Sequence, residues 1–180
     1  MILYHGTTLS ISEKIDESKA LKINSESLYK DPSIQTTPGY IYLSINPALA
    51  FYYGNKHSAH YTDPTEEDSF VVYEIELEKE ELLVDTDELK YVHEKTKEEI
   101  NNYNLDKCLK EAYTCKIGRN LEFKKHVKRK LIVPSSTSPE NFNESPEFKM
   151  KDLKEITESR KDGLKEAIIE KIKNLKWEEL

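Results

Sequence analysis

Two segments, Leu3-Tyr4-His5-Gly6-Thr7-Thr8 and Gly39-Tyr40-Ile41-Tyr42-Leu43-Ser44, decide how this chain folds. The first places a histidine and a glycine at the end of an apolar run that starts at Ile2. The second is a β-rich run that leads into Asn46–Tyr53, where Pro47 suits the first turn of a helix. We therefore expect two short strands, each followed by a helix, with polar side chains where the strands end.

The rest of the chain predicts an α+β domain without the regular strand–helix alternation of a parallel sheet. We expect further helices over Leu9–Ser18, with Ser10 or Ser12 as N-cap, over Asp85–Tyr103 and over Leu105–Tyr113. We expect further strands over Phe70–Leu77, with a solvated acidic face in its second half, over Leu121–Val127 and over Lys130–Val133. Gly54 is expected to end the helix that starts near Pro47, and residues 25–38 and 57–68 are read as polar loops.

A change in character near Glu147 divides the chain. Leu164, Ile168, Ile172 and Leu175 recur at helical spacing, which predicts one amphipathic helix ending near Trp177. We expect a catalytic-type domain over residues 1–143 and a helical extension over residues 144–180. That extension either packs on the domain or offers a docking face to a second copy or a neutralising partner protein.

Composition and charge exclude some classes of protein for this chain. The net charge is −7, so the molecule as a whole does not present the basic surface of a nucleic-acid-binding protein. No stretch approaches the roughly 20 apolar residues of a membrane span. The N-terminus enters a strand with no basic leader, so we expect a cytoplasmic protein, or a toxin delivered by a dedicated export machine. Cys108 and Cys115 are expected to be free thiols.

In this order, the motifs resemble the diphtheria-toxin and poly(ADP-ribose) polymerase branch of the ADP-ribosyltransferases. His5-Gly6-Thr7 matches the His-Gly-Thr form of polymerase-like and rifampin-modifying members, and Ile41–Ser44 followed by Ala50–Tyr53 matches the tyrosine strand and small-residue helix. The resemblance covers residues 1–143. It implies the ADP-ribosyltransferase fold, a split two-sheet β core around an NAD cleft with flanking helices.

The resemblance also implies an activity: transfer of ADP-ribose from NAD to a protein or nucleic-acid acceptor, with release of nicotinamide and without a metal. Cleavage passes through a transition state like an oxocarbenium ion. By resemblance, His5 contacts the ribose, the backbone of Gly6 binds the amide, and Tyr42 stacks on the ring with either Tyr52 or Tyr53. Thr7 and Ser44 belong to the same two motifs and complete the expected NAD-binding set.

The third catalytic position is less defined. The family places a glutamate early on a late strand, where its carboxylate bonds the ribose and orients the acceptor. Glu122 is the only acid in Leu121–Val127 and is our candidate. His126 is the alternative, and it would leave a His-Tyr-His site without the usual carboxylate.

Other uses of the same fold stay open. The protein could hydrolyse NAD, modify a small molecule as the rifampin enzymes do, or bind NAD or ADP-ribose without turnover. The arginine-dependent transferase branch and the RNA 2′-phosphotransferases are disfavoured, because no arginine precedes Arg119. A small stand-alone transferase fits a bacterial or phage toxin–antitoxin pair by analogy alone.

Two further patterns have ordinary explanations. The basic run Lys124–Lys130 reads as a solvated strand face, or else as a contact for phosphates. His57 and His60 with Asp63 have metal-ligand spacing, but no further His or Cys is placed to complete a site.

Overall fold

The computed structural model describes residues 1–26, 36–61, 69–135, 150–159 and 166–180. Its main sheet has six strands in the order β5-β3-β1-β4-β7-β8, and β2 and β6 form a separate two-stranded sheet. Each pair of neighbouring strands in the described chain is antiparallel. The α+β class is therefore confirmed.

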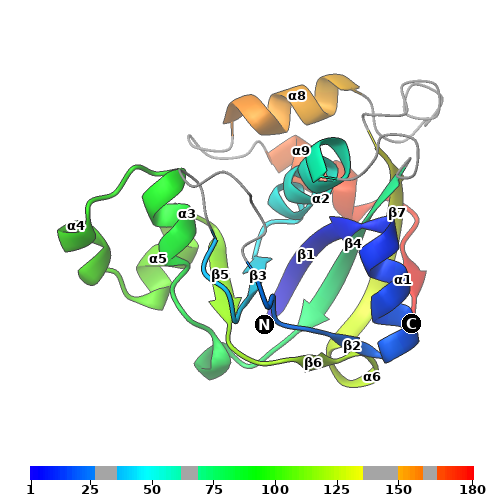
Figure 1. Cartoon of the computed structure of the whole chain (residues 1–180). Coiled ribbons are helices and arrows are strands. Elements are labelled where there is room, and N and C mark those ends of the chain that lie inside the picture. Colours follow the sequence, from blue (N-terminus) through cyan, green and yellow to red (C-terminus); the bar gives the residue numbers. More distant parts are fainter. Residues whose placement is uncertain (27–35, 62–68, 136–149, 160–165) are drawn as a thin grey trace.

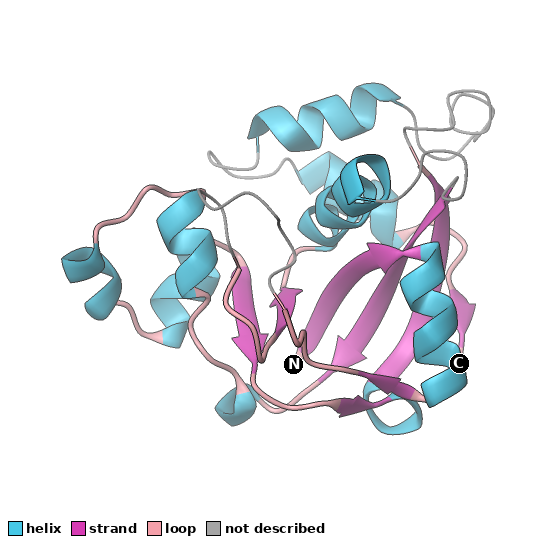
Figure 2. Ribbon diagram, in the orientation of Figure 1, coloured by secondary structure: helices cyan, strands magenta, loops and turns pink. Residues whose placement is uncertain are grey.

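The strands are β1 (Ile2–Thr8), β2 (Ala20–Leu21), β3 (Ile41–Ser44), β4 (Ser69–Glu76), β5 (Thr114–Ile117), β6 (Leu121–Glu122), β7 (Val127–Pro134) and β8 (Glu178–Glu179). The helices are α1 (Leu9–Ser18), α2 (Pro47–Tyr61), the 3-10 turn η2 (Lys79–Glu81), α3 (Thr86–Tyr91), α4 (Lys97–Asn101), α5 (Leu105–Glu111), α6 (Phe123–His126), α8 (Met150–Ser159) and α9 (Glu166–Lys173). Figures 1 and 2 show α2, α8 and α9 grouped together, with α3, α4 and α5 beside the β5 end of the sheet.

Alternation along β1 divides the interior into two cores, because successive strand residues face opposite sides of a sheet. Leu3 packs with α1 and the small sheet, in a cluster that includes Ile15 and Leu121. Tyr4 packs on the other side with Phe51 of α2 and with the helices of the C-terminal segment. His5 follows Leu3 by two positions, so its side chain lies on the α1 side.

The structure confirms the first helix and corrects its cap. Helix α1 covers Leu9–Ser18 as expected, but Thr8 is the N-cap, because its hydroxyl accepts from the backbone N–H of Ile11. Helix α2 does not end at Gly54 and continues to Tyr61. A Cβ on Gly54 would come within 2.7 Å of Phe70, so this glycine serves close packing of the helix on the sheet.

The acidic positions of β4 differ from the expectation of one wet face. Glu74 is 9% exposed and accepts a hydrogen bond of 2.7 Å from Arg129 on β7, whereas Glu76 is exposed. The partner on the neighbouring strand makes burial of Glu74 tolerable.

Two expected continuous elements are interrupted. Leu121–Val127 is not one strand, since β6 ends at Glu122 and one helical turn, α6, precedes β7. Asp85–Tyr103 is not one helix, because α3 ends at Tyr91 and Glu94 has φ +55° before α4 begins.

The C-terminal segment is more than one helix. Ile168 and Ile172 of α9 are buried with Ala48 and Phe51 of α2, so the apolar face of this helix is covered within the chain. Beyond α9, β8 pairs with β7, and the Trp177 ring packs on Tyr4 with centroids 6.1 Å apart. The extension predicted over residues 144–180 thus contributes, in its described part, to the second core.

The cysteines Cys108 and Cys115 are free and buried, as expected. Among the described residues, no helix combines the length and the apolar character needed to cross a membrane.

Candidate functional site

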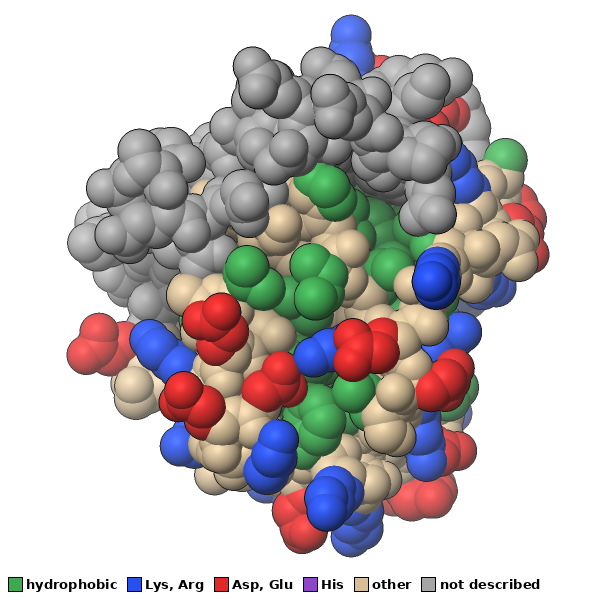
Figure 3. All heavy atoms as spheres, turned by 90° about the vertical axis from the view of Figure 1, so that its right-hand side faces the viewer, with side chains coloured by type: hydrophobic (Ala, Val, Ile, Leu, Met, Phe, Trp, Pro, Cys, Tyr) green, Lys and Arg blue, Asp and Glu red, His purple; other side chains and the backbone are tan. Residues whose placement is uncertain are grey.

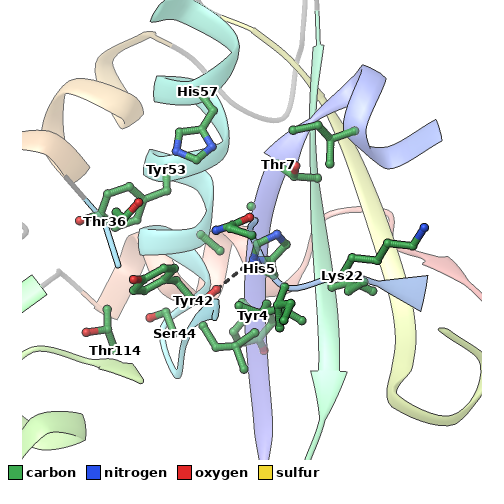
Figure 4. Close-up of a pocket in the computed structure, with 18 of the residues that line it drawn as sticks. Tyr4, His5, Thr7, Lys22, Thr36, Tyr42, Ser44, Tyr53, His57 and Thr114 are labelled. Carbon is green, nitrogen blue, oxygen red and sulfur yellow. Dashed lines mark hydrogen bonds between the residues drawn. The ribbon is translucent and has the colours of Figure 1, made fainter. Parts of the chain in front are cut away.

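A cavity of about 700 Å³ lies against β1, with walls from α1, β2, β3, α2 and α3. This volume falls within the range of small-molecule sites. The cavity brings together six of the seven predicted NAD-site residues: His5, Gly6, Thr7, Tyr42, Ser44 and Tyr53. Figure 4 shows His5 between the aromatic side, with Tyr42 and Tyr53, and the side of Lys22.

His5 is fixed by a hydrogen bond across two neighbouring strands. Its Nδ1 lies 2.9 Å from the carbonyl oxygen of Tyr42 (Figure 4). A carbonyl can only accept, so Nδ1 carries the proton and donates. Burial lowers the pKa of His5, partly offset by this bond, and the neutral ring therefore offers Nε2 as an acceptor.

The Tyr42 ring is held at its hydroxyl end by α3. Its hydroxyl group lies 2.8 Å from the carbonyl oxygen of Thr37 and donates to the carboxylate of Asp87. Burial, followed by the contact with Asp87, raises the pKa of Tyr42, so the phenol stays protonated.

The choice between Tyr52 and Tyr53 is decided by position. Tyr53 is among the described residues that line the cavity, whereas Tyr52 is not. Tyr53 donates a hydrogen bond to the carboxylate of Glu88 on α3. Tyr52 packs against the second core, and its ring also contacts the Tyr53 ring edge-on, with the two centroids 5.0 Å apart.

Three carboxylates from the start of α3 line the same cavity: Asp85, Asp87 and Glu88. Asp85 caps the helix, since its Oδ1 accepts from the backbone N–H of Asp87 at 3.2 Å and of Glu88 at 3.0 Å. Burial, with the charge of Glu88 second, raises the pKa of Asp85 to about 7. Glu88 itself is 8% exposed.

Sequence reasoning did not include these acids in the site. The available signal was an acid at Asp85 with Glu88 three positions later, which is typical of a helix N-terminus. That pattern predicts where a helix starts. It does not predict that Tyr42 of β3 and Tyr53 of α2 contact this helix start.

Gly6 lines the cavity and also lies against α2. A Cβ at this position would overlap the carbonyl oxygen of Ala50 and lie 2.8 Å from the backbone nitrogen of Gly54. The requirement for glycine thus has a structural cause, which is close approach between β1 and α2.

Thr7 and Ser44 both line the cavity and are buried. The Ser44 hydroxyl donates to the carbonyl oxygen of Tyr113 at 2.8 Å and accepts from the backbone N–H of Asn46 at 2.9 Å. Ser44 therefore joins β3 to the start of α2 and to the turn before β5.

The two candidates for the third position lie elsewhere. Among the described residues that line the cavity, neither Glu122 nor His126 occurs. Pairing of β6 with β2 buries Leu121 and turns Glu122 outward, where it is exposed. His126 is buried beside Arg119, with its Nε2 3.4 Å from a guanidinium nitrogen. The structure thus corrects the expectation that this segment supplies an acid to the cleft.

The basic run is largely neutralised. Lys128 pairs with Glu76, Arg129 with Glu74 and Lys130 with Asp16, at 2.7 to 3.0 Å. Figure 3, which looks onto the side of α1 and β7, shows basic and acidic side chains interspersed. The interpretation as a solvated, paired strand face therefore fits these residues better than a phosphate contact.

The part of the cavity beside α1 and β2, away from Tyr42 and Tyr53, has a different lining. Ile15 and Leu21 are buried there, and Lys14 and Lys22 are exposed at its rim. This part thus joins an apolar floor to two cationic side chains.

The remaining histidine pattern yields no metal centre in the described part of the chain, which contains no group of three or more suitable side chains. Asp63 lies outside the described residues, as does the side chain of His60. His57 lines the cavity, and burial, followed by its nearness to His5, lowers its pKa to about 4.

Comparisons of the chain with models of protein families, with curated proteins and with solved structures yield no match.

Proposed function

We propose that the cavity binds NAD and that the protein transfers ADP-ribose from it to a protein or nucleic-acid acceptor, releasing nicotinamide. The observation that carries the proposal is the joint placement of His5, Tyr42 and Tyr53 around one cavity of about 700 Å³. These residues come from β1, β3 and α2, in the order of the motifs that resemble the ADP-ribosyltransferases. The finer fold assignment, a split β core around an NAD cleft, belongs to the same proposal.

Tyr42 and Tyr53 form the nicotinamide end of the proposed site. Both hydroxyl groups donate to carboxylates of α3, which limits rotation of the two rings. A fixed aromatic face favours a planar ring by about 1 kcal/mol beyond the area it buries. In this proposal, backbone groups near Gly6 meet the amide of the nicotinamide.

His5 holds the adjoining ribose. With Nδ1 donating to Tyr42, the neutral ring accepts a ribose hydroxyl at Nε2. In this orientation His5 keeps the contact with the ribose that the resemblance implies, with the histidine as the acceptor. A fixed sugar allows the glycosidic bond to be broken with the acceptor on the opposite face.

Glu88 is our candidate for the catalytic carboxylate in place of Glu122. It is nearly buried, lines the cavity and contacts Tyr53. In the reaction the bond between ribose C1′ and nicotinamide breaks, and nicotinamide leaves with the electron pair. The acceptor oxygen or nitrogen attacks C1′ and loses its proton to the carboxylate, whose negative charge also stabilises the oxocarbenium-like transition state.

The remaining half of NAD fits the part of the cavity beside α1 and β2. Lys14 and Lys22 supply positive charge for the pyrophosphate, and Ile15 and Leu21 give an apolar surface for the adenine. Lysines carry this charge in the proposal, in a chain with no arginine before Arg119.

The test is nicotinamide release from NAD by the purified protein, beside His5→Ala, Tyr42→Ala, Tyr53→Ala and the control Tyr103→Ala, a tyrosine that is not among the described residues lining the cavity. We expect release by the wild type, a loss of at least about 10-fold in the first three variants, and near wild-type release in the control. Release that all four variants retain would contradict the proposed site. Mass analysis of the products separates transfer to an acceptor from hydrolysis.

A further inference from the structure

Three donors converge on the carboxylate of Asp87. Its Oδ1 accepts from the hydroxyl of Thr37 at 2.9 Å, and its Oδ2 accepts from the backbone N–H of Thr37 at 2.8 Å. Oδ2 also receives the hydroxyl of Tyr42. One side chain of α3 thus connects the segment that enters β3 with the aromatic ring in the middle of β3, and we call this group the Asp87 clasp (Asp87, Thr37, Tyr42).

A hydrogen bond joins the clasp to the cap of α3. The backbone N–H of Asp87 donates to Oδ1 of Asp85, the buried cap of α3. The Tyr42 ring is consequently held at both ends, by the β3 backbone and by its hydroxyl. Thr36, next to Thr37, lines the cavity, so the clasp also holds part of the wall.

We infer that Asp87 is a positioning residue of the site, which orients the Tyr42 ring and the Thr36–Thr37 wall for the nicotinamide ring. This inference rests on the proposed function. Asp87 acts through Tyr42 and Thr37, because its two oxygens already accept from them. The carboxylate accepts from all three donors at once, whereas an asparagine keeps one acceptor oxygen and would force a hydroxyl to turn and accept from its N–H.

The experiment is a double-variant cycle of Asp87→Asn and Tyr42→Phe, read by urea unfolding and by the kcat/KM of nicotinamide release. The matched control is Tyr103→Phe with Glu111→Gln, an exposed pair joined by a 2.7 Å hydrogen bond. Neither of these control residues lines the cavity in the described chain.

In unfolding, we expect both pairs to be coupled, with a double variant less destabilised than the two single effects combined. In catalysis, we expect Asp87→Asn and Tyr42→Phe each to lower kcat/KM by about 10-fold, with the double variant no worse than the poorer single variant. The effect should fall mainly on KM and on NAD affinity, because a misplaced ring weakens ground-state binding. The control pair should leave both parameters within about 2-fold.

Two results would overturn the inference. Wild-type kcat/KM and NAD affinity in Asp87→Asn would make the clasp purely structural. Independent, multiplying losses in the double variant would mean that Asp87 does not act through Tyr42. If the wild type neither binds nor cleaves NAD, the proposed function fails and the inference with it, while the unfolding cycle still reports whether the clasp exists.

Discussion

The start of α3 and the end of β6 both carry acidic side chains, yet only those of α3 face the cavity. At α3, Asp85, Asp87 and Glu88 line it and bind the two tyrosines through Asp87 and Glu88. At β6, register with β2 turns Glu122 to solvent. The difference teaches that order along the chain does not assign a catalytic acid, because strand register and helix docking decide which carboxylate meets the site.

The sharpest test of this comparison exchanges each glutamate for glutamine. We expect Glu88→Gln to lower the kcat of nicotinamide release by about 10²-fold or more, since a positioned acid or base contributes about 10²- to 10⁴-fold. Glu122→Gln is the matched control and should stay within about 2-fold, because its side chain is exposed away from the cavity. Loss in Glu122→Gln with full activity in Glu88→Gln would reverse the assignment.

The contact between β1 and α2 positions Tyr53 beside α3. Weakening this contact should therefore disturb the part of the cavity around Tyr53 more than the part lined by β2. Gly6→Ala introduces a Cβ that overlaps the carbonyl oxygen of Ala50, and we expect unfolding to be easier by about 3 kcal/mol. Chemical denaturation measures this change.

Gly118→Ala is the control for that substitution. A Cβ there would lie 3.5 Å from the nearest atom of Tyr40, an ordinary contact. We expect a change in unfolding free energy within about 0.5 kcal/mol. Equal effects of the two alanines would contradict the close approach of β1 and α2.

The smallest expected effect concerns the cap of α3. Burial raises the pKa of Asp85 to about 7 from its ordinary value of 3.8, so the folded state binds its proton more tightly than the unfolded state. The resulting stabilisation is full below about pH 4 and is lost as pH rises to about 7, by at most about 1.4 kcal/mol per pH unit. Asp85→Asn keeps an acceptor for the cap and removes the charge.

Urea unfolding between pH 4 and 8 measures the difference between wild type and Asp85→Asn. We expect the stability of the variant relative to the wild type to rise as pH increases, and to level off above pH 7. A constant difference across this range would show that Asp85 does not titrate there. Asp85→Ala, which also removes the cap, should lose about 1 kcal/mol at every pH.

The parts of the fold that the sequence predicted are those with local signals. Apolar runs gave the strands around Leu3 and Val71, and Pro47 marked the first turn of α2. Local signals failed where tertiary packing decides the outcome. Gly54 sits inside a helix because Phe70 needs the space, and Glu74 is buried because Arg129 stands opposite.

The site divides in the same way. His5, Tyr42 and the alternative of Tyr52 or Tyr53 could be proposed because their motifs occupy short segments near the N-terminus, whereas only the fold shows that Tyr53 lines the cavity. The acids could not, because the contact between Tyr42 and Asp87 joins residues 45 positions apart and that between Tyr53 and Glu88 joins residues 35 apart. The chain has 34 acidic residues, and many of them lie at comparable distances along the sequence from the tyrosines. Residue type alone therefore does not select the acid that contacts each tyrosine.

The proposed function requires that NAD binds in this cavity and that the bond between its ribose and nicotinamide is broken there. The most direct measurement is proton NMR of NAD incubated with the wild-type protein, following free nicotinamide with time and saturation transfer to bound NAD. The proposed function predicts that free nicotinamide appears and that saturation transfer reaches the nicotinamide ring, with both signals reduced by Tyr53→Ala and not by Tyr103→Ala. Intact NAD without saturation transfer would contradict it.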